Sequence, residues 1–427
     1  MKFRSTRNSG ERVGFLEAVE SGLASDGGLY VPCEFPSFRD RLPQDQSFSA
    51  VATQILSEFM AEDFSPNEIS ELIQRAFRFP IPLKAFDSHT SILELFHGPT
   101  AAFKDVAAQF LGEVMGHALK KEKTILVATS GDTGGAVAAA FDGRPGFRVV
   151  ILFPKDGVSP LQRQQLTCWG PNILSVAVEG SFDDCQKTVK RLLADPELCK
   201  QFEFTSANSI NLARLLPQSL YYAASSLWWF NEHHEVANYV IPTGNMGNAV
   251  AAFWAKAMGF PISKIVMATN ANAVVPEYFH SGRYLPQPSV MTLANAMDVG
   301  SPSNFERLQD LWPELKTLEK VSDAVSVSDE EIRATIKNVY QLKREILCPH
   351  TATAMAVRSR LQGDWIVVST AHPAKFTEVV EPLIGCAVPV PPSLQSLRDR
   401  PTHYREITSE ELKRNAIQSV IQQIRKF

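Results

Sequence analysis

The chain has 427 residues, of which 44% are hydrophobic and 21% are charged, and its formal net charge is −4 at pH 7. This length suits two or three domains, and the composition is that of a globular protein with a sizeable buried core. The slightly negative charge gives no electrostatic reason to expect nucleic acid or an anionic membrane surface as a partner. No apolar run approaches the roughly 20 residues of a membrane span. No basic run followed by an apolar stretch opens the chain, so we expect no secretory signal.

Six cysteines are scattered along the chain without a CxxC pair, which is typical of proteins kept reduced in the cytosol. We therefore expect a cytoplasmic protein. The run EHHE at residues 232–235 is a candidate metal site. A solvated helix end explains it better, because metal ligands must converge and need supporting partners. The sequence thus predicts no bound metal.

Residues 1–85 form the first predicted unit, which is mostly helical. VGFLEAVESGL, FSAVATQILSEFM and SPNEISELIQRAFRF have helical apolar spacing, and ASDGGLYVP is typical of a turn before a short strand. Ser65 followed by Pro66 predicts an N-cap with proline at the first helical position. FPIPL then interrupts the pattern and is interpreted as a linker.

From about residue 90, short apolar runs rich in valine and isoleucine alternate with helical stretches. The runs are TILVATS, FRVVILFP, ILSVAV, NYVIP, KIVMATN and WIVVST. Strands that are apolar on both faces and alternate with helices predict an α/β fold with covered parallel sheets. Ligands of such sheets bind at the carboxyl ends of the strands, so the loops there are the candidates for a site.

Lys104 lies among small and apolar residues in HGPTAAFKDVAAQF, at the start of a predicted helix. The positive end of the helix dipole and an apolar environment both disfavour the ammonium form, so its pKa should fall. A lowered pKa is what an amine needs to form a Schiff base and to move protons. The alternatives are a lysine that reaches the surface or one that pairs with Asp105.

Three further loops follow or end predicted strands. TSGDTGGAV, residues 129–137, combines hydroxyls, glycines and a helix N-terminus and can hold a carboxylate. PTGNMGNAVAAF, residues 242–253, can hold a phosphate with backbone N–H groups, although it is neither a P-loop nor a GxGxxG motif. VVSTAHPAKF places the Thr370 hydroxyl where it could face a ring nitrogen. An ordinary turn with an N-capping residue is the alternative for each loop.

Taken together, these stretches resemble the threonine synthase family. HGPTAAFKD, SGDTGGA, SANSIN, TGNMGN, NAMDVGSPSN, PHTA and STAHPAKF occur in the order of that family, and GLASDGGLYVP resembles its opening segment. The resemblance covers nearly the whole chain and points to the longer form of the enzyme. It implies a fold-type-II pyridoxal-phosphate enzyme, an α/β protein with two parallel-sheet domains and an additional N-terminal, mostly helical domain.

The resemblance implies three parts of the chain. They are an N-terminal domain at 1–85, a catalytic core at 86–390 that depends on pyridoxal phosphate, and a C-terminal helical tail at 391–427. Within the core, a smaller mobile α/β subdomain spans about 105–215 and a larger one takes the remainder. The resemblance also favours a monomer.

The resemblance further implies roles for single residues. Lys104 would form the Schiff base with the cofactor, pyridoxal 5'-phosphate, and Thr370 would hydrogen-bond the pyridine nitrogen. The loop that grips the cofactor's phosphate matches Gly244, Asn245, Met246, Gly247 and Asn248. The loop at the substrate carboxylate and the cofactor's ring hydroxyl matches Ser130, Gly131, Asp132 and Thr133. Asp132 replaces the usual Asn of the wider fold type, and Met246 replaces a frequent Phe, so the contact of Asp132 with the cofactor stays open.

The implied reaction converts O-phospho-L-homoserine and water to L-threonine and phosphate by β,γ-replacement, the last step of threonine biosynthesis. The substrate's phosphate needs a cationic partner. The candidates in the core are Lys155, Arg163 and Arg214. We favour Arg214, which follows SANSIN, and expect Asn208 and Asn211 of that segment to contact substrate. Asp298 and Asn304 either line the pocket or cap a turn.

Two kinds of alternative function stay open from the sequence. An O-phosphohomoserine phospho-lyase or a serine/threonine dehydratase would use the same fold and release ammonia and a keto acid. A nucleotide-binding protein would instead use the glycine loops for a dinucleotide. Product analysis distinguishes a lyase or dehydratase from a threonine synthase. The colour of the purified protein distinguishes a pyridoxal-phosphate enzyme from a nucleotide-binding protein.

Overall fold

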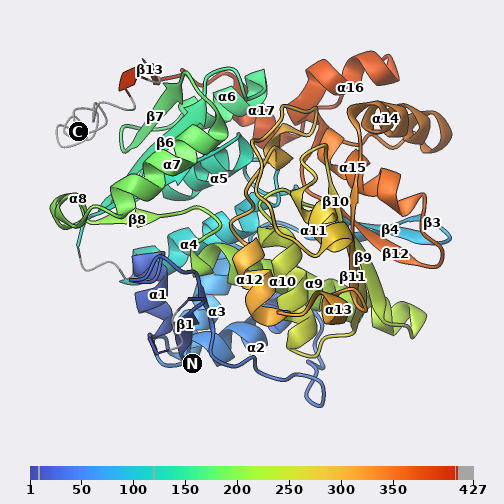
Figure 1. Ribbon diagram of the computed structural model, residues 1–427, viewed down its shortest axis with the longest axis horizontal. Coiled ribbons are helices and arrows are strands. Elements are labelled where there is room, and N and C mark those ends of the chain that lie inside the picture. Colours follow the sequence, from blue (N-terminus) through green and yellow to red (C-terminus); the bar gives the residue numbers. More distant parts are fainter. Residues whose placement is uncertain (8–9, 119–120, 409, 412–427) are drawn as a thin grey trace.

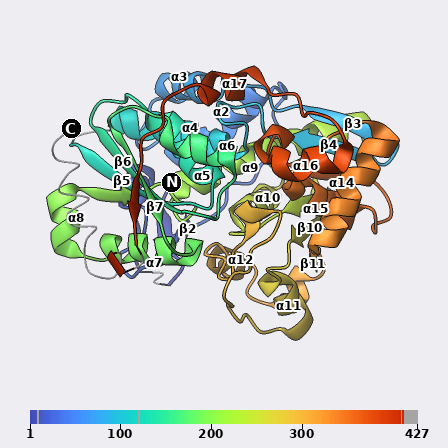
Figure 2. The same cartoon turned by 90° about the horizontal axis from the view of Figure 1, so that it is seen from above.

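The computed structural model describes residues 1–427 except 8–9, 119–120, 409 and 412–427. Two open sheets with helices on both faces lie side by side, as two views of the chain show (Figure 1, Figure 2). An N-terminal unit packs against α4 (Lys104–Ala118) and α9 (Leu212–His233). The predicted α/β class with parallel sheets is therefore confirmed.

The N-terminal unit contains two short antiparallel strands and three helices. They are β1 (Phe3–Ser5), β2 (Tyr30–Pro32), α1 (Phe15–Ser21), α2 (Phe48–Met60) and α3 (Pro66–Ala76). The predicted N-cap of α3 is present: the Ser65 side chain accepts from the backbone N–H of Glu68, and Pro66 takes the first helical position. The rings of Phe15 and Phe110 of α4 lie 6.5 Å apart between centroids. The unit thus shares one apolar core with α4.

The larger sheet has six strands in the order β11-β10-β9-β12-β4-β3, and only β3 runs antiparallel to its neighbour. The strands are β3 (Leu83–Asp87), β4 (Thr90–Glu94), β9 (Ala237–Pro242), β10 (Ile262–Thr269), β11 (Ser322–Ser326) and β12 (Trp365–Ser369). Its main covering helices are α9, α10 (Gly247–Ala257), α14 (Asp329–Lys343) and α15 (Pro349–Arg358). Ile366 and Val368 of β12 face one apolar layer and Val367 faces the other. This alternation explains why the first four residues of the strand are all apolar.

The smaller sheet has five parallel strands in the order β13-β7-β6-β5-β8. They are β5 (Lys123–Ala128), β6 (Phe147–Pro154), β7 (Ile173–Val178), β8 (Phe204–Ser206) and β13 (Arg405–Ile407). Its helices are α5 (Asp132–Phe141), α6 (Pro160–Thr167), α7 (Phe182–Leu193) and α8 (Pro196–Phe202). Ile125 and Val127 of β5 pack toward the layer of α4 and α5, whereas Leu126 packs toward α7. The mobility of this part stays a prediction.

Shorter helices connect and cover the sheets. They are α11 (Val274–Ser281), η1 (Asn295–Met297), α12 (Phe305–Leu311), α13 (Leu315–Leu318), η2 (Pro373–Phe376), α16 (Thr377–Ile384) and α17 (Pro392–Arg398). Arg307 of α12 is fully buried and donates to the backbone oxygens of Tyr30, Ser209 and Ile210 at 2.7–3.1 Å. This guanidinium fastens the SANSIN segment to the N-terminal unit and to α12.

The C-terminal tail differs from the all-helical prediction. It contains α17 and then the strand β13, which pairs in parallel with β7 and adds an edge to the smaller sheet. Three residues are too short to show a strand pattern, and the free edge of β7 determines their conformation. Residues 412–427 of the predicted tail lie outside the described part.

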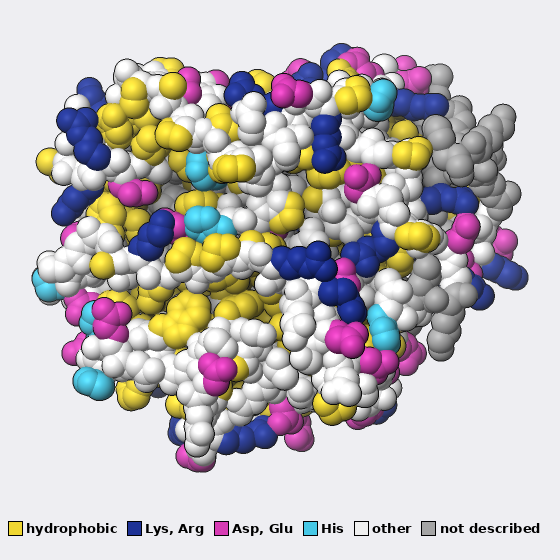
Figure 3. All heavy atoms as spheres, turned by 180° about the vertical axis from the view of Figure 1, so that it is seen from behind, with side chains coloured by type: hydrophobic (Ala, Val, Ile, Leu, Met, Phe, Trp, Pro, Cys, Tyr) yellow, Lys and Arg dark blue, Asp and Glu magenta, His cyan; other side chains and the backbone are white. Residues whose placement is uncertain are grey.

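Among the described residues, no helix is long and apolar enough to span a membrane. On the face opposite to that of Figure 1, basic and acidic side chains lie interspersed (Figure 3).

Candidate active site

A pocket lies where the carboxyl ends of strands from both sheets approach each other. Residues 244–248 follow β9, Thr370 follows β12, and Asp132 follows β5, and all of them line it together with Lys104. The structure thus brings together residues that lie more than 200 positions apart in the sequence. This is the place that the rule for parallel sheets predicts for a ligand.

Lys104 begins α4, as predicted, and its amine lies 4.7 Å from the centroid of the Phe103 ring. Burial, reinforced by the charge of Arg214, lowers the pKa of Lys104 to about 8, although Asp132 acts to raise it. Asp105 is not its partner, because that carboxylate accepts bonds from the backbone N–H and the hydroxyl of Thr100 at 2.9 and 2.7 Å. The apolar surroundings of Lys104 and the nearby charge of Arg214 thus act in the direction of the expected fall in its pKa.

The turn before Lys104 is fixed to the two residues that directly follow β12, Thr370 and Ala371. The backbone N–H of Phe103 donates to the Thr370 carbonyl at 2.8 Å, and Ala102 pairs with Ala371 in an antiparallel bridge. Ala101 in this turn has a φ of 53°, a left-handed conformation that costs free energy in a residue with a side chain. The backbone thus holds the Lys104 amine and the Thr370 hydroxyl in one pocket.

The loop at 244–248 joins β9 to the N-terminus of α10. Gly244 packs so closely that an added Cβ would lie 2.7 Å from Cα of Met297, so only glycine fits there. The Asn245 amide donates to the Ser209 hydroxyl at 2.6 Å, which fixes the loop to the SANSIN segment. Met246 has a φ of 61° and precedes the helix, so the first N–H groups of α10 are turned to the pocket end of the loop. This arrangement is a ready anion site.

Several buried polar atoms at the pocket have no hydrogen-bond partner among the described residues. Nine such side-chain atoms occur among the described residues, and four belong to residues that line the pocket. These four are Nε of Arg214, Oγ1 of Thr243, Nδ2 of Asn248 and Nδ1 of His350. A buried polar atom without a partner costs about 1–3 kcal/mol, so their concentration at one pocket indicates a ligand rich in acceptor oxygens. A cofactor that carries a phosphate and a ring hydroxyl fits this donor set.

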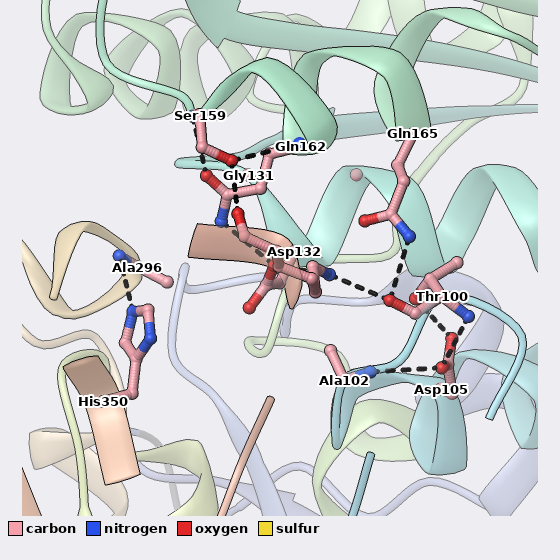
Figure 4. A network of polar contacts seen from close by, with 12 residues as sticks. Thr100, Ala102, Asp105, Gly131, Asp132, Ser159, Gln162, Gln165, Ala296 and His350 are labelled. Atoms are coloured by element: carbon pink, nitrogen blue, oxygen red, sulfur yellow. Dashed lines mark hydrogen bonds and ion pairs between the residues drawn. The ribbon is translucent and has the colours of Figure 1, made fainter. Parts of the chain in front are cut away.

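A buried ion pair lies beside the pocket and was not predicted. The Lys375 amine of η2 lies 2.8 Å from Oδ1 of Asp132 and also donates to the Thr100 carbonyl at 2.9 Å. The Gln162 amide donates to the same Asp132 oxygen at 3.0 Å (Figure 4). Burial acts to raise the pKa of the Asp132 carboxyl, but the positive charge of Lys375 and the hydrogen bonds from Lys375 and Gln162 hold it below its usual value. Asp132 is therefore a carboxylate whose charge is neutralised locally.

Comparison with known proteins agrees with this geometry. The family model described as "Pyridoxal-phosphate dependent enzyme" matches residues 90–370, and those described as "Threonine synthase N terminus" and "Threonine synthase, C-terminal" match 2–77 and 351–421. The chain belongs to the threonine synthase family. Threonine synthase of Serratia marcescens is 39% identical over 402 residues, which is 92% of this chain and 93% of that protein.

Two solved threonine synthase structures resemble the chain over nearly its full length. The crystal structure from Escherichia coli has a TM-score of 0.91 at 36% identity and covers 98% of this chain and 100% of its own. The structure from Brucella melitensis, described as bound to PLP, has a TM-score of 0.88 at 33% identity and covers 99% of both chains. The resemblance inferred from the ordered motifs is confirmed.

Among the residues that the threonine synthase motifs single out, some have structural contacts instead of pocket contacts. The Asn208 amide is bonded at both ends to the backbone of Ala128, at 2.7 and 3.1 Å. The Asn211 amide caps α9 and donates to the carbonyls of Val19 and Ser206. Neither lines the pocket, and both amides hold the segment in place. Their expected contacts with substrate stay a prediction.

Residues 130–133 form the loop that we predicted at the substrate carboxylate. Of these four residues, Asp132 lines the pocket. Ser130, Gly131 and Thr133 flank it at the N-terminus of α5. The hydroxyl of Thr129 accepts from the N–H groups of Gly131 and Gly134 at 2.9 and 3.0 Å, which fixes the loop.

The two residues from NAMDVGSPSN support neighbouring loops. Asp298 accepts from the Thr292 hydroxyl and the Asn270 amide, both at 2.7 Å, and burial raises the pKa of its carboxyl to about 7. Asn304 donates to Ser209 and to the Asn245 carbonyl, each at 3.1 Å. Asp298 thus stabilises a turn, and Asn304 holds the loop at 244–248 in place.

Sequence reasoning missed two buried residues at the site, Lys375 and His350. Lys375 lies between Ala374 and Phe376 in STAHPAKF, so the signal that marked Lys104, a lysine among apolar residues, was present there too. His350 lies in PHTA, and only its three-dimensional position against Ala296 distinguishes it from an ordinary core histidine.

We expect Lys104 to react as an amine with a lowered pKa. Its neutral, nucleophilic fraction rises as the pH rises through a pKa of about 8, whereas a free lysine amine titrates at about 10.4. Acetic anhydride labelling of the protein stripped of pyridoxal phosphate, followed by peptide mass spectrometry, should give a midpoint near pH 8 for the Lys104 peptide. A midpoint above pH 10 would contradict the burial argument.

Removal of Lys375 alone should destabilise the fold by about 3–5 kcal/mol, because Lys375→Met leaves the Asp132 carboxylate buried without its partner. The double change Lys375→Met with Asp132→Asn removes both charges and should recover much of the loss. Urea unfolding of the two variants beside the wild type measures this. Equal losses in both would show that packing of Lys375, and not its charge, provides the stability.

Proposed function

We propose that this chain converts O-phospho-L-homoserine and water to L-threonine and phosphate, with pyridoxal 5'-phosphate as its cofactor. The observation that carries the proposal is a half-buried lysine of lowered pKa that shares one pocket with a glycine-rich helix N-terminus and a buried arginine. Membership of the threonine synthase family along nearly the whole chain supports it. When bound, the cofactor supplies an electron sink that makes the protons at the substrate's α- and β-carbons removable.

Residues of both loops would hold the cofactor. The N–H groups at the N-terminus of α10 and the free Nδ2 of Asn248 suit its phosphate. Oδ1 of Asn248 accepts hydrogen bonds from the hydroxyls of Tyr221 and Tyr222 at 2.6 and 2.8 Å. These bonds fix the orientation of the amide, so that Nδ2 points away from the two tyrosines and can donate to a ligand. Thr370 supplies a hydroxyl, not a carboxylate, for the ring nitrogen, so that nitrogen need not stay protonated.

Lys104 would bind the cofactor's aldehyde and then move protons. With a pKa of about 8, its amine is neutral in a useful fraction of molecules near neutral pH and can act as a base and then as an acid. Asp132 would hold Lys104 in its ammonium form if its charge were free. The Lys375 amine forms an ion pair with Oδ1 of Asp132 at 2.8 Å. This pairing offsets the negative charge of Asp132 and so keeps Lys104 available for proton transfer.

Arg214 is the group that we propose for the substrate's phosphate. It lies in the first turn of α9, is buried at the pocket, and its Nε–H has no partner within the described part of the chain. Burial lowers its pKa to about 10, so it stays a cation at neutral pH. Lys155 instead pairs with Glu406 at 2.7 Å, and Arg163 donates to the carbonyl of Lys155. Neither of these two lines the pocket.

We further propose a cytoplasmic monomer that does not bind nucleic acid. The six cysteines are all free, as suits a reducing compartment. The net charge of −4 and the mixed charges of the face in Figure 3 give no positive surface for a polyanion.

The proposed reaction is tested by measuring phosphate and threonine together from O-phospho-L-homoserine. We expect one threonine for each phosphate in the wild type, and no threonine from Lys104→Ala because the base and the covalent link are lost. Ammonia and 2-oxobutyrate in place of threonine would identify a lyase or dehydratase. A colourless protein that binds NAD would remove the proposal altogether.

Arg214→Gln should reduce kcat/KM for O-phospho-L-homoserine by about 30-fold or more, as expected for loss of a buried charged hydrogen bond worth about 2–5 kcal/mol. Inhibition by inorganic phosphate should weaken in parallel. Arg163→Gln is the matched control, since Arg163 lies outside the pocket, and it should keep phosphate inhibition as in the wild type. Unchanged phosphate inhibition in Arg214→Gln would move the phosphate site elsewhere.

A further inference from the structure

The side chain of His350 forms part of the pocket wall, at the second position of α15. It is 3% exposed, and its ring packs 4.8 Å from the ring of Phe376 between centroids. Nε2 lies 3.1 Å from the backbone N–H of Ala296 and accepts from it. In Figure 4 a dashed line joins this nitrogen to Ala296, and none reaches the other ring nitrogen.

The protonation state of this ring follows from its surroundings. Burial lowers the pKa of His350 to about 4, and the cations of Lys375 and Lys104 act in the same direction, against the carboxylate of Asp132. The ring is therefore neutral at physiological pH and carries one proton. A nitrogen that accepts a hydrogen bond has no proton, so the proton lies on Nδ1.

Nδ1 is thus a buried N–H donor, and it has no hydrogen-bond partner among the described residues. Leaving such a group without a partner costs about 1–3 kcal/mol, which a ligand in the pocket would recover. Asp132 also lines the pocket, but a carboxylate can only accept and repels an anionic oxygen. A ligand oxygen on that side of the pocket therefore needs its donor from another residue, and His350 presents one.

We propose that His350 donates a hydrogen bond from Nδ1 to an anionic oxygen of the bound reactants and is a further catalytic residue. The inference rests on the proposed function. The oxygen belongs either to the cofactor's ring hydroxyl or to the substrate's carboxylate, which share this chemistry. A donor at the ring oxygen would change the protonation and the absorption spectrum of the cofactor. A donor at the carboxylate would instead orient the substrate.

The rival role of His350 is purely structural, as an acceptor that anchors Ala296 and the η1 turn. Two amide substitutions separate the roles because they mimic different ring nitrogens. His350→Asn places its amide near the Nδ1 position and leaves the Ala296 N–H unpaired. His350→Gln places its amide oxygen near the Nε2 position, so it keeps the Ala296 bond and loses the donor at Nδ1.

The test compares wild type, His350→Asn and His350→Gln as holoenzymes, each with its thermal unfolding midpoint. We expect His350→Gln to lose about tenfold or more in kcat/KM, as loss of one net hydrogen bond predicts, and His350→Asn to recover most of that loss. Three outcomes would each overturn the inference. A larger loss in His350→Asn would indicate that the ring only anchors Ala296, and equal losses in both variants would indicate a packing role. Wild-type kinetics in both variants would indicate that the ring has no role.

Two further measurements identify the acceptor. If it is the cofactor's ring oxygen, the visible absorption spectrum of substrate-free His350→Gln and its pH dependence will differ from those of the wild type. If it is the substrate's carboxylate, that spectrum will be unchanged and spectral titration with L-threonine will show weaker binding. A wild type without threonine synthase activity would refute the proposed function, and a reversed order of variants in an active enzyme would refute only the role of His350.

Discussion

The site depends on how four charged side chains, those of Lys104, Asp132, Arg214 and Lys375, share one largely buried space. The Asp132 carboxylate lies near enough to the Lys104 amine to raise its pKa, and the chemistry needs that pKa low. Lys375 lies 2.8 Å from the carboxylate and, together with Gln162, satisfies the Asp132 oxygen. With that charge neutralised, burial and Arg214 dominate the environment of Lys104. Without Lys375, the Asp132 carboxylate would raise the pKa of Lys104. The pair of Lys375 and Asp132 therefore helps to keep the pKa of the Lys104 amine near neutral pH.

This arrangement also ties the two sheets together at the place where the reaction would occur. Asp132 starts the helix after β5 of the smaller sheet, whereas Lys375 follows β12 of the larger one. Ser159 at the start of α6 bonds the Lys375 carbonyl at 2.8 Å, and Gln165 donates to the carbonyl of Thr100. The contact between the sheets is therefore polar and buried, and its geometry fixes both sides of the pocket. Catalytic geometry and subdomain docking rest on the same few bonds.

Particular residues show how far sequence reasoning reached. Lys104, the loop at 244–248 and Thr370 were identified because their positions after strands or at helix starts are visible as local patterns, and the structure brings them together. Asn208 and Asn211 belong to the same ordered motifs, yet their amides hold backbone groups of β5 and the N-terminal unit. A motif marks a segment that the fold needs, but it does not say which of its side chains point to the ligand.

The amino-acid sequence by itself determined the α/β class, the lysine at a helix start and the two loops that suit a phosphate and a ring nitrogen. Periodicity, glycine placement and local charge are short-range properties, so they can be read without coordinates. The tertiary structure alone decided that Lys375 neutralises Asp132, that His350 turns one nitrogen to Ala296 and leaves the other free, and that β13 completes the smaller sheet. These are contacts between segments distant in the chain, and their partners are selected by packing geometry, which no local pattern encodes.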